Sequence, residues 1–157
     1  MVKIQFNADE HYERLRHADP SRLIDSTSGW FHQKKSDLDS RHVYFRNKRL
    51  KGKDMPLFLS ECGGFTRPIE GHMFNPQAQY GYGATDSEEA LTAKIEQMWN
   101  EMVLPSIPDG LCGLVYTQLS DVEDEINGLY TYDRELCKVN KERMRALAAR
   151  AQLILEQ

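Results

Sequence analysis

The sequence lacks several features that would place it in a specialised class of protein. No apolar run approaches the ~18 residues of a membrane-spanning helix, and residues 1–7 contain no apolar region of a signal peptide. The three cysteines form no Cys-x-x-Cys pair, and an odd number cannot all be bridged within one chain. This favours a reducing compartment, and we expect the cytoplasm. Excess positive charge is also absent, since 20 basic and 24 acidic residues give a net charge of −4. We therefore expect neither nucleic acid nor a membrane as a partner.

What the chain does have is the composition of an ordinary folded domain. Its 157 residues suit one domain over 1–157, and 40% hydrophobic with 28% charged residues are usual values. Short apolar strands separated by helices or long loops, without an Asn-Gly hairpin, predict a parallel α/β fold. The expected elements are a helix over 7–18, strands over 22–25, 42–45 and 57–59, a helix over 86–102, a strand over 113–117 and a helix from about 140.

Capping and hydrophobic spacing define the predicted helices. Capping boxes pair Asn7 with Glu10 and Asp86 with Glu89 at the starts of the first two helices. Trp99 lies beside the apolar stripe of the second helix, so we expect it in the core rather than against a ligand. The predicted buried stripes are Leu91, Ile95, Met98 and Met102 in the second helix and Met144, Leu147, Ala151 and Leu155 in the last.

Glu61 is the sharpest candidate for chemistry. It follows the apolar run 57–59, which reads as a strand buried on both faces, and it precedes Gly63 and Gly64. In parallel sheets and barrels, catalytic groups lie where strands end and loops begin. The two glycines lack side chains, so a bulky substrate could approach the carboxylate closely. A surface or capping glutamate in a Gly-Gly turn is the alternative, and the local residues leave both open.

Aromatic and imidazole side chains surround this candidate in the sequence. His42 and Tyr44 alternate along the preceding strand, so both should face one side, where they could hydrogen-bond a carboxylate. A histidine and a tyrosine satisfied within the core are the alternative. Further aromatic side chains lie in loops and suit the apolar faces of sugars, although they could also cover the core; they are Trp30, Phe74, Tyr80 and Tyr82.

Other polar groups are weaker candidates. Asp121, Glu123 and Glu125 lack the glycine and spacing of an EF-hand loop, so a solvated loop or polar support is favoured over a metal site. Cys62 has no catalytic cysteine signature around it. The basic stretch 46–54 reads as a solvated loop. We expect no cofactor and no metal.

The motif over 60–65, Ser-Glu-Cys-Gly-Gly-Phe, resembles the nucleophile motif of family-2 glycoside hydrolases. This family comprises β-galactosidases, β-glucuronidases and β-mannosidases. Three further stretches look like the fifth, sixth and eighth barrel strands of the family, namely 19–30, 37–45 and 113–129. The resemblance implies that the chain is the C-terminal half, strands 5–8, of a (β/α)8 TIM barrel.

The resemblance also assigns roles to residues. It implies that Glu61 is the catalytic nucleophile of a retaining β-glycosidase acting on a carbohydrate substrate. Cys62 stands where the family often has an aromatic residue, and Tyr116 stands where many relatives have tryptophan, which leaves the sugar undefined. The substrate-binding residues that it implies are Trp30, His42, Tyr44, Tyr116 and Gln118.

The second carboxyl group of the family has no counterpart in the sequence. Family members carry their acid/base glutamate in an Asn-Glu pair that ends the fourth strand, and Gln5-Phe6 resembles residues that follow this pair. The resemblance thus implies a nucleophile without its acid/base, and negligible activity of the isolated chain on natural glycosides. The expected partner is the missing N-terminal half or a second copy in a homo-oligomer. A catalytically inactive sugar-binding or assembly module is the alternative function.

Overall fold

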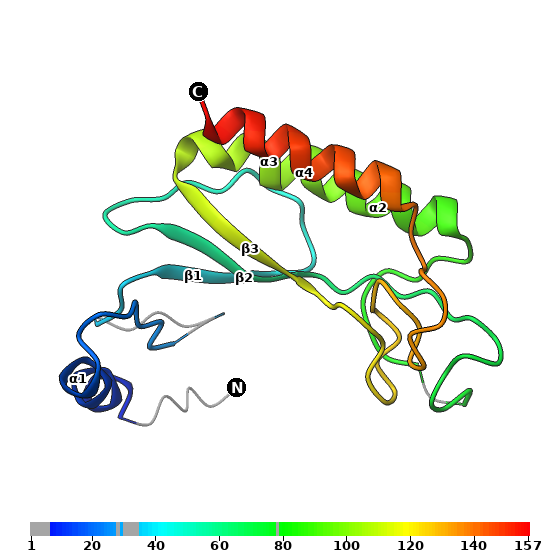
Figure 1. Cartoon of the computed structure of the whole chain (residues 1–157), viewed down its shortest axis with the longest axis horizontal. Helices are drawn as coiled ribbons and strands as arrows, with labels where there is room; N and C mark the ends of the chain where they lie inside the picture. Colours follow the sequence, from blue (N-terminus) through cyan, green and yellow to red (C-terminus); the bar gives the residue numbers. More distant parts are fainter. Residues whose placement is uncertain (1–6, 28, 30–34, 78) are drawn as a thin grey trace.

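The computed structural model describes residues 7–27, 29, 35–77 and 79–157 (Figure 1). The chain forms helix α1, strands β1 and β2, a long helical segment, strand β3 and helix α4. Helix α2 continues through a π-helical turn, η1, into α3 and the 3-10 turn η2. The bounds are α1 Ala8–Ala18, β1 Asp39–Val43, β2 Leu57–Gly63, α2 Glu88–Met98, η1 Trp99–Val103, α3 Leu104–Ser106, η2 Ile107–Asp109, β3 Leu111–Thr117 and α4 Lys141–Leu155.

The described strands form one parallel sheet in the order β1-β2-β3, which confirms the predicted α/β class with parallel strands. Each strand extends beyond its predicted bounds at one end. β1 begins at Asp39 because Asp39 pairs with Leu57, and it ends at Val43, two residues before the predicted end. Among the described residues, no helix has the length and apolar character needed to cross a membrane.

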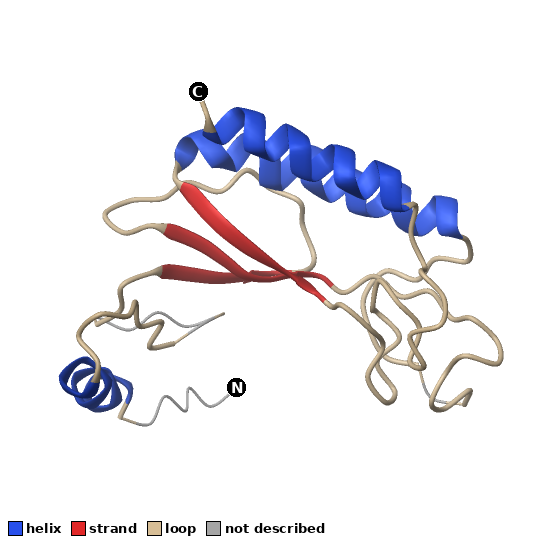
Figure 2. Cartoon of the chain, viewed as in Figure 1, coloured by secondary structure: helices blue, strands red, loops and turns tan. Residues whose placement is uncertain are grey.

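Helices cover one face of this sheet. Figure 2 shows α2 and α4 side by side over the strands, with α1 standing apart beyond β1. Arg143 of α4 ties the two covering helices together, since its guanidinium donates to the carboxylates of Glu89 and Glu96 in α2. The core lies between sheet and helices and includes Leu57, Leu59 and Cys62 of β2, Leu91, Ile95 and Met98 of α2, and Leu147 of α4.

The predicted stripe of α2 is confirmed, since its members are buried and the last of them, Met102, lies in η1. Trp99 packs against the core, as predicted. The stripe of α4 is wrong at its end: the buried part is centred on Leu147, and Leu155 at the last residue of the helix is 58% exposed.

Both predicted capping boxes are wrong. The cap of α2 is Ser87, whose hydroxyl accepts from the Ala90 amide, so the helix begins one residue later than Asp86 would set it. Asn7 precedes α1 with a φ of 52°, and its side chain makes no capping hydrogen bond. Asn140 does cap α4, where its side chain accepts from the Arg143 amide.

The strand predicted over 22–25 is also wrong. The amide of Ile24 donates to the Asp37 carboxylate, and its carbonyl accepts from the Asp37 amide. Both backbone groups of Ile24 are thus paired with the loop before β1 rather than with a neighbouring strand. The described sheet consequently has three strands, one fewer than the sequence predicts.

A β-bulge in β2 sets the direction of Glu61. Against β1, Leu59 pairs with Arg41 and Glu61 with His42, so Ser60 is an extra residue in β2. Bulges of this kind turn the side chains beyond them to the other face. Leu59 and Cys62 both face the helices, whereas Glu61 between them faces away. Glu61 therefore lies within β2 rather than after it, and β2 is not buried on both faces, because Phe58 is only half-buried.

Candidate active site

The carboxyl ends of the three strands meet at one edge of the sheet, where loops distant in sequence are joined by backbone hydrogen bonds. The Gly64 amide after β2 donates to Thr117 at the end of β3, and Tyr82 donates to the Gly64 carbonyl. The Tyr80 amide in turn donates to the Asp124 carbonyl in the loop after β3. Loops after β2 and β3 are thus fixed beside each other, around the end of the strand that carries Glu61.

The partners of the Glu61 carboxylate are a residue of β1, His42, and the residue directly after β1, Tyr44. The Tyr44 hydroxyl donates to Oε2 of Glu61 at 2.5 Å, and Nδ1 of His42 lies 3.1 Å from the same oxygen. The described residues give Oε1 no hydrogen bond, and the Glu61 side chain is 42% exposed. One carboxylate oxygen is therefore held, while the described residues leave the other without a hydrogen bond. This confirms the prediction that His42 and Tyr44 share a face with Glu61.

The direction of the protons on this network follows from the single proton of the phenol. Tyr44 gives that proton to Glu61, so the Thr117 hydroxyl, 3.2 Å away, donates to the Tyr44 oxygen. Burial raises the pKa of Tyr44, and the hydrogen bond to the Glu61 carboxylate raises it further. The phenol consequently remains a donor at any ordinary pH. Thr117 was missed as a site residue, although its place at the end of a predicted strand was a usable signal.

Tyr116 does not reach the carboxylate. It pairs with Cys62 across β2 and β3, and its ring packs against the core on the helix side of the sheet. Burial raises the pKa of the Tyr116 phenol. Alternation along β3 explains the outcome, because Thr117 faces Glu61 and its neighbour must then face the helices. The role implied for Tyr116 by the resemblance therefore has no contact with Glu61 to support it.

Gln118 and Trp30 complete the set of predicted substrate-binding residues. The Gln118 amide nitrogen donates to Oε2 of Glu125 and to Oδ1 of Asn127, each at 3.0 Å. Gln118 thus belongs to a polar cluster in the loop after β3 and is not a partner of Glu61 in the described contacts. Trp30 lies outside the described residues.

The two glycines after Glu61 do not leave an open approach. A Cβ on Gly63, whose φ is +88°, would lie 2.2 Å from the Tyr116 ring. A Cβ on Gly64 would lie 2.8 Å from the ring of Tyr82. Aromatic rings fill the space that the sequence assigned to substrate, so the glycines serve close packing around the site.

Aromatic rings extend the site beyond Tyr44. The Tyr82 ring packs against Tyr44, with the centroids 4.6 Å apart, and it also contacts Phe45 at 5.1 Å and Tyr80 at 6.0 Å. Phe45 is 69% exposed and Tyr80 is 54% exposed. A cavity of about 290 Å³ opens beside Phe45, lined in part by Tyr44, Phe45, Tyr82 and Lys94. Phe74 is not part of this group, since it pairs with Tyr132 instead.

The carboxylates in the acidic loop after β3 have different surroundings. Asp121 is buried and pairs with the buried ammonium of Lys138 at 2.8 Å, and it also accepts from the Gly128 amide. The prediction of a solvated loop is thus wrong for Asp121, because its carboxylate neutralises a lysine in the interior. Glu125 fits the predicted role of polar support, because its Oε2 accepts hydrogen bonds from the side-chain amides of Gln118 and Asn127.

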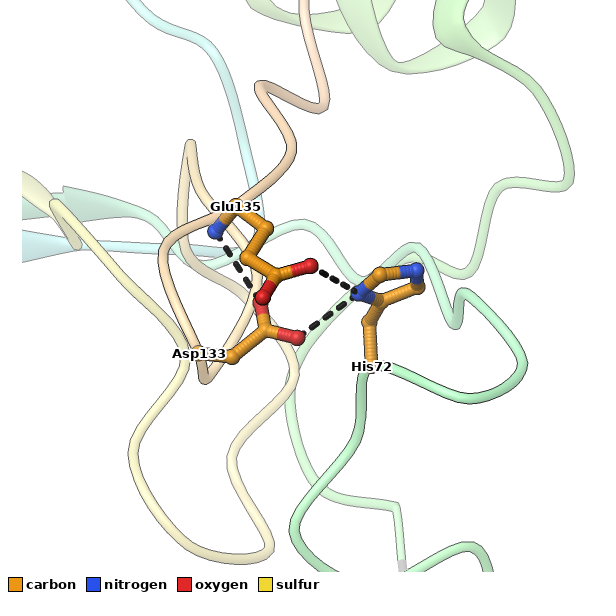
Figure 3. Close-up of side chains that lie close together, drawn as sticks. All are labelled: His72, Asp133 and Glu135. Atoms are coloured by element: carbon orange, nitrogen blue, oxygen red, sulfur yellow. Dashed lines mark hydrogen bonds and ion pairs between the residues drawn. The ribbon is translucent and has the colours of Figure 1, made fainter.

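Residues suited to a metal come together elsewhere. Figure 3 shows His72, Asp133 and Glu135 pointing toward one another, with their nearest donor atoms within 4.8 Å. Nδ1 of His72 bonds Oδ2 of Asp133 at 2.7 Å, while Oδ1 accepts from the Thr131 hydroxyl. The pKa of Asp133 is lowered to about 2, chiefly by the Thr131 hydrogen bond, with further help from the Glu135 amide and His72. We interpret the group as a clasp between two loops.

Cys62 is unsuited to nucleophilic chemistry. Its side chain is fully buried in the core between the sheet and the helices, and burial raises the pKa of its thiol to about 12. A thiolate is the reactive form of cysteine. The neighbour of Glu61 therefore has a packing role.

A scan against protein-family models finds no match to the chain, and a search of curated proteins finds none either.

Proposed function

We propose that this chain carries the nucleophile side of a retaining β-glycosidase site, with Glu61 as the nucleophile. The observation that carries the proposal is the asymmetric bonding of its carboxylate. Tyr44 and His42 hold Oε2, whereas Oε1 has no hydrogen bond from the described residues. A nucleophilic carboxylate needs this arrangement, since one oxygen must be oriented while the other attacks.

The chemistry follows the double displacement of retaining enzymes. Oε1 of Glu61 bonds to the anomeric carbon as the bond to the leaving oxygen breaks, which gives a glycosyl ester. Water then attacks the same carbon and releases the carboxylate. The hydrogen bond from Tyr44 and the nearby Nδ1 of His42 help to orient the Glu61 carboxylate before attack. The Tyr44 phenol supports this role because its raised pKa keeps its proton on the donor side.

The second carboxyl group must come from outside the residues that hold Glu61. In retaining enzymes the two carboxyls lie about 5–5.5 Å apart. The groups bonded to Glu61 in the described structure are a phenol and an imidazole. General acid–base help contributes roughly 10²–10⁴-fold to rate, so the chain alone should fail on natural glycosides. A partner that supplies an acid/base carboxyl, a complementing half barrel by our proposal, would complete the site.

A substrate with a very good leaving group tests the proposal, because it needs little protonation. We expect slow release of dinitrophenolate from 2,4-dinitrophenyl β-glycosides by the wild-type chain and none from their methyl counterparts. Glu61→Gln should abolish this release while circular dichroism stays unchanged. Equal release by the variant and the wild type would overturn the assignment. Sugar binding without release would favour the inactive sugar-binding module.

A further inference from the structure

The polar cluster after β3 lies beside the aromatic rings that extend the site. Tyr80 and Glu125 form a parallel bridge, in which the Ile126 amide donates to the Tyr80 carbonyl at 3.1 Å. The Tyr80 hydroxyl is 3.3 Å from that of Tyr82, whose ring packs on Tyr44. A continuous line of contacts therefore joins Glu125, through two tyrosines, to the partner of Glu61.

The Glu125 carboxylate accepts its hydrogen bonds from the described residues at one oxygen. Its Oε2 accepts from the side-chain amides of Gln118 at 3.0 Å and Asn127 at 3.3 Å. Oε1 has no hydrogen bond from the described residues, and the side chain is half-buried. The pKa of Tyr82 is raised first by its hydrogen bond with Tyr80, then by burial, and further by the charges of Glu125 and Glu61. The charges of Glu125 and Glu61 therefore both contribute to the raised pKa of the Tyr82 phenol.

The charge near Glu125 is negative. Glu123 and Asp124 precede it in the same loop, and both are exposed. The buried ammonium of Lys138 does not balance them, because it is bonded to Asp121 and to the Ile126 carbonyl. A ligand group at Oε1 must therefore be a donor without negative charge, and a sugar hydroxyl meets this requirement whereas a carboxylate does not.

We infer that Glu125 is a specificity-determining residue of this site, whose Oε1 accepts hydroxyl hydrogen bonds from a neutral pyranose ring resting on the exposed ring of Tyr80. This inference rests on the proposed function, since it names the substrate class of the same site. The amides of Gln118 and Asn127 orient the carboxylate, the exposed ring of Tyr80 offers an apolar face, and the acidic loop repels uronic acids.

Binding of simple methyl glycosides, followed by saturation-transfer NMR titration of the full chain, tests the inference. We expect millimolar binding of methyl β-D-galactoside or methyl β-D-glucoside and at least about tenfold weaker binding of methyl β-D-glucuronide. Glu125→Gln removes the charge with little change of shape. It should weaken binding of the neutral sugar about tenfold, as expected when a hydrogen bond to a charged group is lost. It should also reduce the difference in affinity between the neutral sugar and the glucuronide.

Glu123→Gln is the matched control. It removes the same charge from an exposed side chain two residues before Glu125. It should leave the affinity for the neutral sugar unchanged. The inference is wrong if Glu125→Gln binds the neutral sugar like the wild type, if the glucuronide binds equally well, or if no glycoside binds. Dinitrophenolate release that depends on Glu61 would still stand in those cases. Conversely, Glu125-dependent binding without such release would retain the inference and remove the proposed function.

Discussion

At the scale of single residues, the site is a line of donors that ends on the Glu61 carboxylate. Thr117 donates to Tyr44, and Tyr44 donates to Oε2 of Glu61, where His42 also lies within hydrogen-bonding distance. His42 and Tyr44 come from the end of β1 and the residue after it, and Thr117 comes from the end of β3. Removing one donor should therefore change the hydrogen bonding of Glu61 without dismantling the sheet.

Tyr44→Phe removes the phenolic donor and keeps the ring that packs on Tyr82. Since a hydrogen bond to a charged group contributes about 1.5–3 kcal/mol, dinitrophenolate release should fall roughly 10- to 100-fold. Stopped-time assays with purified protein would measure the rate, and thermal unfolding would report any loss of fold. Tyr132→Phe, in a loop away from Glu61, is the control and should keep the wild-type rate. An unchanged rate in Tyr44→Phe would contradict the proposed role of the phenol.

Gly63→Ala should destabilise the fold through the Tyr116 ring. A Cβ there would lie 2.2 Å from the ring at a φ of +88°, so strain and overpacking together should cost about 2–5 kcal/mol. Gly71 has a similar φ of +82° with no atom within 4 Å of its added Cβ. Gly71→Ala should therefore cost only about 1–2 kcal/mol of backbone strain. Urea unfolding measures both, and equal losses would show that the Tyr116 contact is unimportant.

At the scale of elements, the sequence predicts what depends on local pattern and misses what depends on pairing. The apolar runs of β2 and β3 and the buried stripe of α2 indicate a parallel sheet covered by helices, and the structure confirms it. The extra residue at Ser60 is visible only in the strand register, because alternation alone does not reveal a bulge. The prediction of a strand over 22–25 is wrong because Asp37, in the loop before β1, accepts the hydrogen bond of the Ile24 amide.

The same division holds for the site. His42 and Tyr44 could be predicted from their alternation, since the end of β1 lies beside Glu61 in a parallel sheet. Gln118 and Glu125 could not be joined from sequence, because their contact needs the loop after β3 to fold back on itself. The family resemblance also implied a substrate-binding role for Tyr116, whose direction only the register of β3 decides.

The loop clasp of His72 and Asp133 predicts a pH dependence of stability. The pKa of Asp133 lies near 2 in the folded chain, below its ordinary 3.8, so the ionised form is favoured by folding. This contribution is present above pH 3.8 and is lost as the pH falls toward 2. Asp133→Asn should therefore lower the free energy of unfolding most above pH 4, with the difference from wild type vanishing near pH 2.

Chemical unfolding at a series of pH values between 2 and 6 checks this prediction. His72→Gln should have a smaller effect than Asp133→Asn, because the Thr131 hydroxyl and the Glu135 amide still hold the carboxylate. A difference between wild type and Asp133→Asn that stayed constant over this range would show that Asp133 titrates normally.

At the scale of the whole molecule, the sheet is covered unequally. Helices α2 and α4 lie over one face (Figure 2), while the other face carries Glu61 and its partners. Val115 in the middle of β3 is 48% exposed because its neighbours Leu114 and Tyr116 pack toward the helices. β1 and β3 are also edge strands of the described sheet. Exposed edges and apolar surface favour association with another chain.

We expect the isolated chain to form a homo-oligomer at micromolar concentration through this face. Val115→Glu should shift the chain toward monomer, because it places a charge in the contact. Leu155→Glu makes a similar change at a residue 58% exposed at the end of α4, on the helix side, and should not affect association. Sedimentation velocity measures the distribution. A monomeric wild type, or equal dissociation by both variants, would contradict the expectation.

Covalent trapping tests the central claim about Glu61 most directly. A 2,4-dinitrophenyl 2-deoxy-2-fluoro-β-glycoside should transfer its sugar slowly to the wild-type chain, with or without an added N-terminal half barrel of a family-2 glycosidase. Peptide mapping by mass spectrometry should find the sugar on the peptide that contains Glu61, and Glu61→Gln should remain unlabelled. A label on any other carboxylate, or no label in either arrangement, would contradict the claim that Glu61 is a glycosidase nucleophile.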